Sequence, residues 1–126
     1  MSRWLLNLFF LLGTFALASA ASDSAAAEQR LLERARQEAP GEVQLHVIKT
    51  TGRMADFAAK VRKVERVPGW PQVRAEGEAA FSAWDNHKRD FAWRSEKFEV
   101  LWDVTDRGEL KLNEVTVGGI SRKADS

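Results

Sequence analysis

Two histidines and a pair of glutamates are the residues whose types and spacing could support acid–base or metal chemistry. His46 and His87 lack the H-x-H or H-x-x-x-H spacing that brings two imidazoles to one metal ion. Glu76 and Glu78 are i and i+2 neighbours of a predicted strand, so their carboxylates share one face about 7 Å apart. That separation suits glycoside hydrolysis, but any solvated strand face has it. We predict no catalytic residue, no metal site and no cofactor, and keep a hydrolase using these four residues as an alternative.

The environment of each histidine is predicted from the strands around it. His46 is expected to be a partly buried histidine on the polar side of a strand, bonded to its neighbours. His87 lies in SAWDNHKRDFAW, residues 82–93, between two strands. If Phe81 and Ala83 face inward on the first strand, and Phe91 and Trp93 on the second, an odd number of residues must connect them. We therefore predict a three-residue turn, 86–88. A turn has no cavity to exclude water, so His87 is predicted to be solvated.

The first twenty residues have the three parts of a cleavable secretory signal. Arg3 is followed by an apolar run and by the small residues Ala18, Ser19 and Ala20. The run is interrupted by polar residues and is shorter than the roughly 20 apolar residues that span a membrane. We expect cleavage after Ala20 and no membrane span in the mature chain. Export to the periplasm is expected, with the extracellular space as the alternative, because the chain has no cysteine and must fold without disulfides.

The charge balance argues against a general nucleic-acid binder. Removal of Arg3 leaves 18 Lys and Arg residues of the original 19, against 18 Asp and Glu residues, so the mature chain has no net charge. Nucleic-acid binders usually have a basic excess. The remaining length suits one small domain with a single core.

The hydrophobic pattern predicts two helices and a series of strands. A helix over residues 21–41 has a narrow apolar stripe that Pro40 and Gly41 end. Alternating residues 43–52 predict a strand, and residues 54–66 have helical spacing of apolar residues. From residue 73 onward, apolar residues occupy alternate positions in three strand segments. A change of phase predicts β-bulges between residues 94 and 97 and near residues 113–114. Residues 105–109 predict a hairpin with the loop Asp106, Arg107 and Gly108.

These elements predict an α+β fold over residues 42–121, followed by a disordered tail over residues 122–126. A curved antiparallel meander of about four strands is expected to wrap the amphipathic helix over residues 54–66, with the first helix as an addition. In outline this architecture is similar to cystatin-like and nuclear-transport-factor-like rolls. The similarity is one of architecture and implies no function.

The tryptophans provide the candidate binding residues. Trp84 falls on the outward phase of its strand, where Ala92 and Leu101 are also apolar, and Trp70 lies in a turn between two prolines. One hypothesis places the first helix over this outward face through Leu31, Leu32 and Ala35. The other leaves the face open to a partner, because aromatic residues are enriched at interface centres.

We therefore expect a small exported domain that acts without catalysis and binds a protein or another envelope component. The candidate surface consists of Trp84, Leu101, Trp70 and Ala92. The alternative is a roll that holds a small apolar ligand against its inward face. The candidate pocket consists of Phe57, Phe91, Trp93, Phe98 and Trp102.

Overall fold

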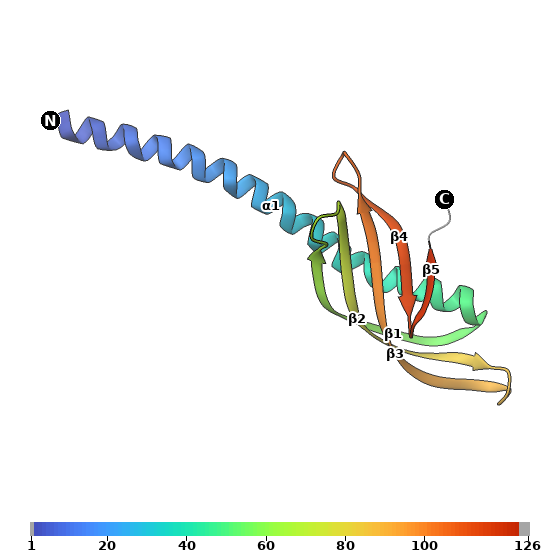
Figure 1. The fold of residues 1–126 in the computed structure, drawn as a ribbon. Helices are drawn as coiled ribbons and strands as arrows, with labels where there is room; N and C mark the ends of the chain where they lie inside the picture. The colour runs from blue at the N-terminus through green and yellow to red at the C-terminus, as the bar shows by residue number, and fades with distance from the viewer. Residues whose placement is uncertain (1, 124–126) are drawn as a thin grey trace. The chain divides into compact units, whose positions relative to one another are not determined.

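The computed structural model describes the backbone of residues 2–123 and the side chains of residues 23–119. It has the α+β order α1 (Ser2–Thr51), β1 (Met54–Arg66), β2 (Gln72–Asp85), β3 (Asp90–Val104), β4 (Leu110–Val117) and β5 (Ile120–Lys123). The strands form one antiparallel meander in the order β1-β2-β3-β4-β5 (Figure 1). The side chains of the predicted signal peptide lie outside the described residues, as do residues 124–126 of the predicted tail.

The chain divides into two compact units, Met1–Arg30 and Leu31–Ser126. Within residues 2–30 the first unit is helical. The second unit contains the remainder of α1 and the whole sheet, and it holds the hydrophobic core.

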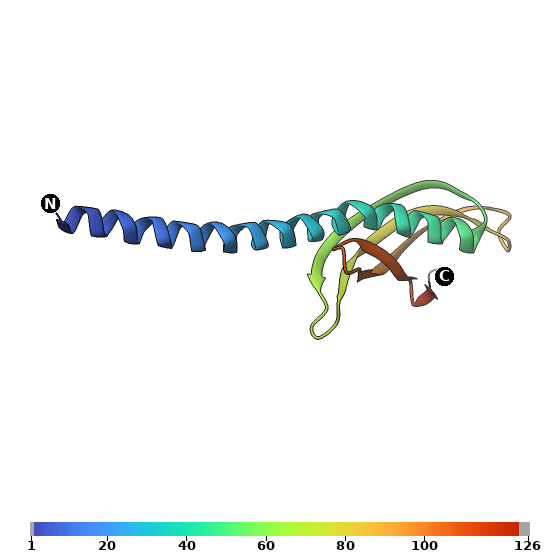
Figure 2. The same cartoon turned by 90° about the horizontal axis from the view of Figure 1, so that it is seen from above.

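Residues 31–51 of α1 pack on one face of the sheet, which we call the inner face (Figure 2). Ala35, Ala39, Val43 and Val47 recur every fourth position and are at most 2% exposed. That interval places them in one stripe along a helix. Their strand partners include Val73, Ala75, Phe81, Phe98, Val100 and Trp102. Burial of each of the two valines contributes about 1.5–3 kcal/mol to the free energy of unfolding.

The prediction that residues 43–52 form a strand is wrong. In the helix Val43, His46 and Val47 are buried, whereas Leu45 is 51% exposed. The alternating residues Val43, Leu45 and Val47 do not share one face. The residues that pack on the sheet are those at four-residue spacing from Ala35. Gly52 ends the helix with φ of 78°, and its N–H donates to the Ile48 carbonyl at 2.8 Å.

The predicted helix end at Pro40 and Gly41 is also wrong, since α1 continues through both residues. Proline inside a helix lacks one hydrogen-bond donor and costs roughly 3 kcal/mol relative to alanine. The buried positions before and after the Pro-Gly pair, Ala39 and Val43, hold the helix on the sheet at this point.

We expect Gly41→Ala to raise the free energy of unfolding by about 0.5–1 kcal/mol. A Cβ at Gly41 meets no atom within 4 Å, and alanine favours a helix interior over glycine. Urea denaturation measures the change. Gly52→Ala is the matched control and is expected to destabilise, because Gly52 has the left-handed conformation. A Gly41→Ala protein of lower stability would contradict a helix through this position.

Residues 54–66 form edge strand β1, so the helix predicted there is wrong. Its inner-face residues are Met54, Phe57, Ala59, Val61 and Val64. β1 has two register shifts, one between Met54 and Asp56 and one between Val61 and Lys63. At each shift the spacing between successive inner-face residues increases from two residues to three. Alternation with two bulges thus imitates helical spacing. At the second bulge Arg36 of α1 donates a hydrogen bond to the Val61 carbonyl at 3.2 Å.

The alternation predicted for β2 is confirmed. Val73, Ala75, Ala79, Phe81 and Ala83 are buried on the inner face. The 105–109 hairpin is also confirmed, because the Thr105 N–H donates to the Glu109 carbonyl at 2.9 Å and Gly108 has φ of 74°. The bulge near residue 113 is confirmed, since Leu101 pairs with Glu114 while Trp102 pairs with Leu112.

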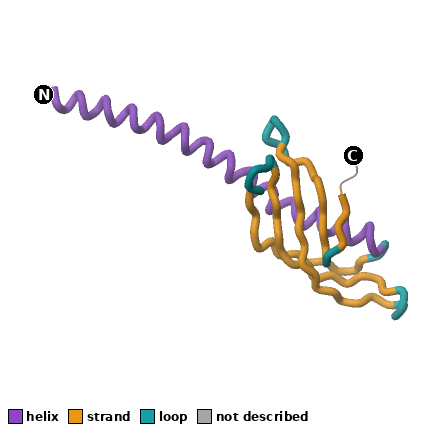
Figure 3. The backbone as a smooth tube through the Cα atoms, in the orientation of Figure 1, coloured by secondary structure: helices purple, strands orange, loops and turns teal. Residues whose placement is uncertain are grey.

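The bulge predicted between residues 94 and 97 is absent from the described strands. β2 and β3 pair without interruption from Gln72 with Asp103 to Asp85 with Asp90. Phe91 and Trp93 therefore lie opposite Trp84 and Ser82 on the outer face, and their predicted inward orientation is wrong. The connection has four residues, 86–89, rather than the predicted three. Figure 3 shows this turn and the α1–β1 connection at one end of the sheet, and the β1–β2 and β3–β4 turns at the other.

Candidate binding surface

An aromatic cluster lies on the outer face of the β2–β3 hairpin. Trp84, Phe91 and Trp93 form it, and we call these three residues the aromatic patch. The rings of Trp84 and Phe91 meet edge to face, with centroids 5.5 Å apart and planes at 81°. Trp93 lies two residues along the strand from Phe91, so the two side chains point to the same face. Trp93 is 68% exposed and Phe91 is 41% exposed.

The aromatic patch lies on the opposite side of the sheet from the helix. Leu31 and Ala35 of α1 pack with the inner-face residues. The hypothesis that these helix residues cover the outward face around Trp84 is therefore wrong. Within the described part of Leu31–Ser126, the exposed fractions of Phe91 and Trp93 show that no side chain buries them. The core does not account for these aromatics.

Basic side chains lie near the aromatic patch at this end of the sheet. The guanidinium of Arg53 stacks over the Trp84 ring, 5.5 Å from its centroid. Lys88 and Arg89 are exposed in the four-residue turn. Arg94 follows Trp93 on the inner face, over the Phe81 ring, where it lines a small space with residues 46, 47, 50 and 51 at the end of α1. A cation is favourable beside a helix C-terminus, because the last carbonyls carry partial negative charge.

The turn itself is ordered by local hydrogen bonds. Asp85 Oδ1 accepts the N–H groups of His87 at 2.9 Å and Lys88 at 3.3 Å. These two bonds hold the pKa of Asp85 below its ordinary value. The indole N–H of Trp84 donates to Asn86 Oδ1 at 3.0 Å, and Arg89 has φ of 53°. The turn therefore presents its side chains from a constrained backbone.

An open depression of about 530 Å³ adjoins the aromatic patch. Its lining includes Trp84 and Trp93, the turn residues 85–88, and Arg94. Aromatic faces, a hydrogen-bonded turn and cations thus meet at one end of the sheet. Such a combination can bind an anionic or amphipathic surface, because apolar and cationic contacts are presented together.

The predicted surface residues do not form a single patch. Trp84 and Leu101 share the outer face, but Leu101 pairs with Arg74, ten residues from Trp84 along β2. Ten residues of strand span about 33 Å when straight. Trp70 is 67% exposed in the β1–β2 turn, at the far end of the sheet. Ala92 pairs with Ala83 and lies on the inner side, so its predicted outward orientation is wrong.

The alternative ligand pocket is likewise divided between two faces. Phe98 and Trp102 are buried in the core, and Phe57 packs against it. Phe91 and Trp93 point away from that core on the outer face. The five aromatics therefore do not line a common cavity.

The acid–base candidates are separated from one another. His46 is 5% exposed under the sheet, whereas His87 is exposed at the turn. Arg62 donates to Glu78 at 2.9 Å and so holds the Glu78 pKa below its ordinary value. A glycosidase general acid needs the opposite shift. Arg74 Nε lies 3.4 Å from Glu76 Oε1. Among residues 23–119, no group of three or more His, Cys, Asp or Glu side chains has metal-binding geometry.

Sequence reasoning missed the contribution of Phe91 and Trp93 to the outer face. Placing them in phase with Trp84 makes the connection even and removes one bulge from β3. The simpler register could therefore have been inferred from residues 82–93, but it required leaving two large aromatics out of the core.

Within the described residues, no helix is long and apolar enough to cross a membrane. The chain matches no protein-family model, no curated protein and no solved structure.

Proposed function

We propose that this chain is an exported, non-catalytic interaction module that binds a protein or another component of the cell envelope through the aromatic patch. The observation that carries the proposal is the exposure of Phe91 and Trp93 beside Trp84, on the face opposite the helix. Tryptophan is enriched at the centres of binding interfaces, and the largest apolar patch on a folded protein is often functional. The similarity to cystatin-like and nuclear-transport-factor-like rolls remains a prediction about topology.

Export supports the proposal through the signal-like residues 1–20 and the absence of cysteine. We place the mature protein in the periplasm, with the extracellular space as the alternative. Preorganisation is a second support. Asp85 and Asn86 fix the turn through hydrogen bonds, so little backbone conformational freedom is lost when the hairpin binds.

Photocrosslinking in the source cell tests the proposal. A benzophenone amino acid at position 93 is expected to form an envelope adduct, whether the partner is a protein or a lipid. The same probe at Arg107, an exposed residue of the β3–β4 loop at the other end of the sheet, is the control. Adducts that depend on position 93, and that fall when Trp84 is changed to alanine, support the patch. Equal labelling from both positions, or none from position 93, contradicts it.

A further inference from the structure

The β2–β3 hairpin extends beyond both neighbouring strands. β1 pairs with β2 as far as Ala83, and β4 pairs with β3 as far as Phe98. One backbone hydrogen bond continues beyond each of these pairs, because the Trp84 N–H donates to the Arg53 carbonyl at 3.2 Å and the Gly118 N–H donates to the Lys97 carbonyl at 2.9 Å. The turn, Trp84 and Phe91 therefore lie beyond the last residue pairs with β1 and β4, whereas Trp93 lies opposite Ser82, which still pairs with β1. Figure 1 shows the β2–β3 turn at the free end of this hairpin.

The tip of this hairpin is positive. Residues 84–94, together with Arg53 and with Asp56 opposite Ser82, contain four basic and three acidic side chains, and one of the basic residues, Arg94, lies on the inner face. Asp85 directs an oxygen at the turn amides, and Asp90 Oδ1 accepts the Phe91 N–H at 2.8 Å. Lys88 and Arg89 are exposed at the tip. A surface that matches this end must accept aromatic rings and attract cations.

From this complementarity we infer that the aromatic patch and the basic turn dock the protein on an anionic phospholipid surface. Tryptophan is enriched where hydrocarbon meets water, because its ring is apolar and its N–H is polar. Lysine and arginine near an anionic leaflet add electrostatic attraction. The inference rests on the proposed function and names the partner of that same surface.

The size of the aromatic patch favours a lipid over a folded protein. Phe91 and Trp93 together expose roughly 250 Å² at the fractions given above. A stable protein interface needs about 800 Å² from each partner, and lysine is depleted from such interfaces. A bilayer requires no matching shape, because its headgroups adapt to the few side chains that enter.

Hydrogen exchange of the full chain tests the inference at the hairpin itself. Phosphatidylglycerol vesicles are expected to slow amide exchange in residues 84–93, whereas phosphatidylcholine vesicles leave it unchanged. Raising the salt concentration should reverse the effect, because it screens the attraction. The peptide-level readout separates the hairpin from any binding by residues 1–30.

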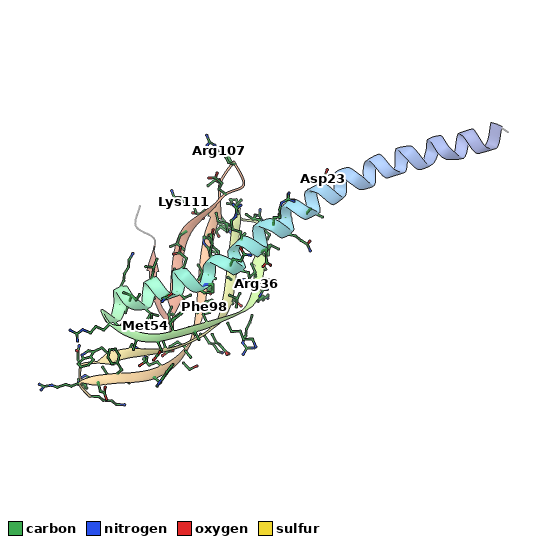
Figure 4. All side chains as sticks on the ribbon, turned by 180° about the vertical axis from the view of Figure 1, so that it is seen from behind. Asp23, Arg36, Met54, Phe98, Arg107 and Lys111 are labelled. Carbon is green, nitrogen blue, oxygen red and sulfur yellow. The ribbon has the colours of Figure 1, made fainter. Side chains whose placement is uncertain are left out.

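Matched charge variants provide the quantitative comparison. Lys88→Gln with Arg89→Asn is expected to raise the lipid concentration for half-maximal protection by roughly 30-fold, at about fivefold for each cation removed. Asparagine suits the left-handed φ of Arg89. Arg107→Asn with Lys111→Gln removes two cations near the β3–β4 loop, and Figure 4 shows both residues away from Met54 at the hairpin end. This control should behave as the unmodified chain. Trp93→Ala should weaken protection roughly tenfold.

The outcomes separate this inference from the proposed function. Equal protection by both lipids, protection confined to residues outside the hairpin, or equal effects of the two charge variants overturns the lipid partner. Absence of protection together with a protein adduct from position 93 overturns the lipid partner and leaves the proposed function standing. Absence of protection together with no adduct of any kind overturns both.

Discussion

Changing Val47 to aspartate is expected to lower the free energy of unfolding by about 3–5 kcal/mol, whereas the same change at Leu45 should cost less than about 1 kcal/mol. Val47 is 2% exposed and packs in the core, so aspartate there places a charged carboxylate in a buried position. Leu45 is 51% exposed, and aspartate there remains solvated. Urea denaturation monitored by tryptophan fluorescence measures both proteins.

The pair discriminates between two backbone conformations for the same residues. A strand would place Val43, Leu45 and Val47 on one face, and the two aspartates would then be equally damaging. A helix separates positions 45 and 47 by about 200° around its axis. Similar losses from Leu45→Asp and Val47→Asp would therefore contradict a helix over residues 43–51.

Changing Trp102 to alanine should cost about 3–5 kcal/mol of stability, whereas Trp93→Ala should change it by less than about 0.5 kcal/mol. Trp102 is 1% exposed, and its neighbours Val73 and Leu112 cannot fill the space that it leaves. Trp93 is 68% exposed on the outer face and supports no core contact. Thermal unfolding followed by circular dichroism gives both values.

Trp70→Ala is the internal control for this comparison. Its side chain is 67% exposed in the β1–β2 turn, so its loss should also be nearly neutral. If Trp93 pointed inward, Trp93→Ala and Trp102→Ala would lower the stability by similar amounts. A large loss from Trp93→Ala would restore that orientation and remove the aromatic patch as a binding surface. A neutral Trp93→Ala protein is also the folded variant that the vesicle experiment requires.

The parts of the fold that were predicted correctly depend on neighbouring residues. The β2 alternation follows from two-residue periodicity, and the β3–β4 hairpin follows from an odd loop with a glycine in the left-handed conformation. The bulge beside Asn113 follows from a change of phase within a short strand. In each case the local pattern allows one geometry.

The errors occurred where one local pattern fits two geometries. Val43, Leu45 and Val47 fit a strand by themselves, whereas Ala35 and Ala39 extend the helical stripe through a proline. β1 fits a helix because its two bulges change the apolar interval. Near the start of β3, aromatic size favoured a core position for Trp93, but the uninterrupted pairing with β2 places Trp93 opposite Ser82 on the outer face. These choices depend on contacts between distant segments.

The sequence by itself determined the α+β class, the meander from β2 to β4 and the lack of cysteine, and it predicts an export-type N-terminus. Each follows from composition or from periodicity within about ten residues. Tertiary structure decided which segment became the helix on the inner face, and therefore which face remained open. Because a sheet of this size has one helix to cover it within Leu31–Ser126, burying Ala35, Ala39, Val43 and Val47 on the inner face leaves Trp84, Phe91 and Trp93 at the surface. That packing choice creates the candidate binding surface.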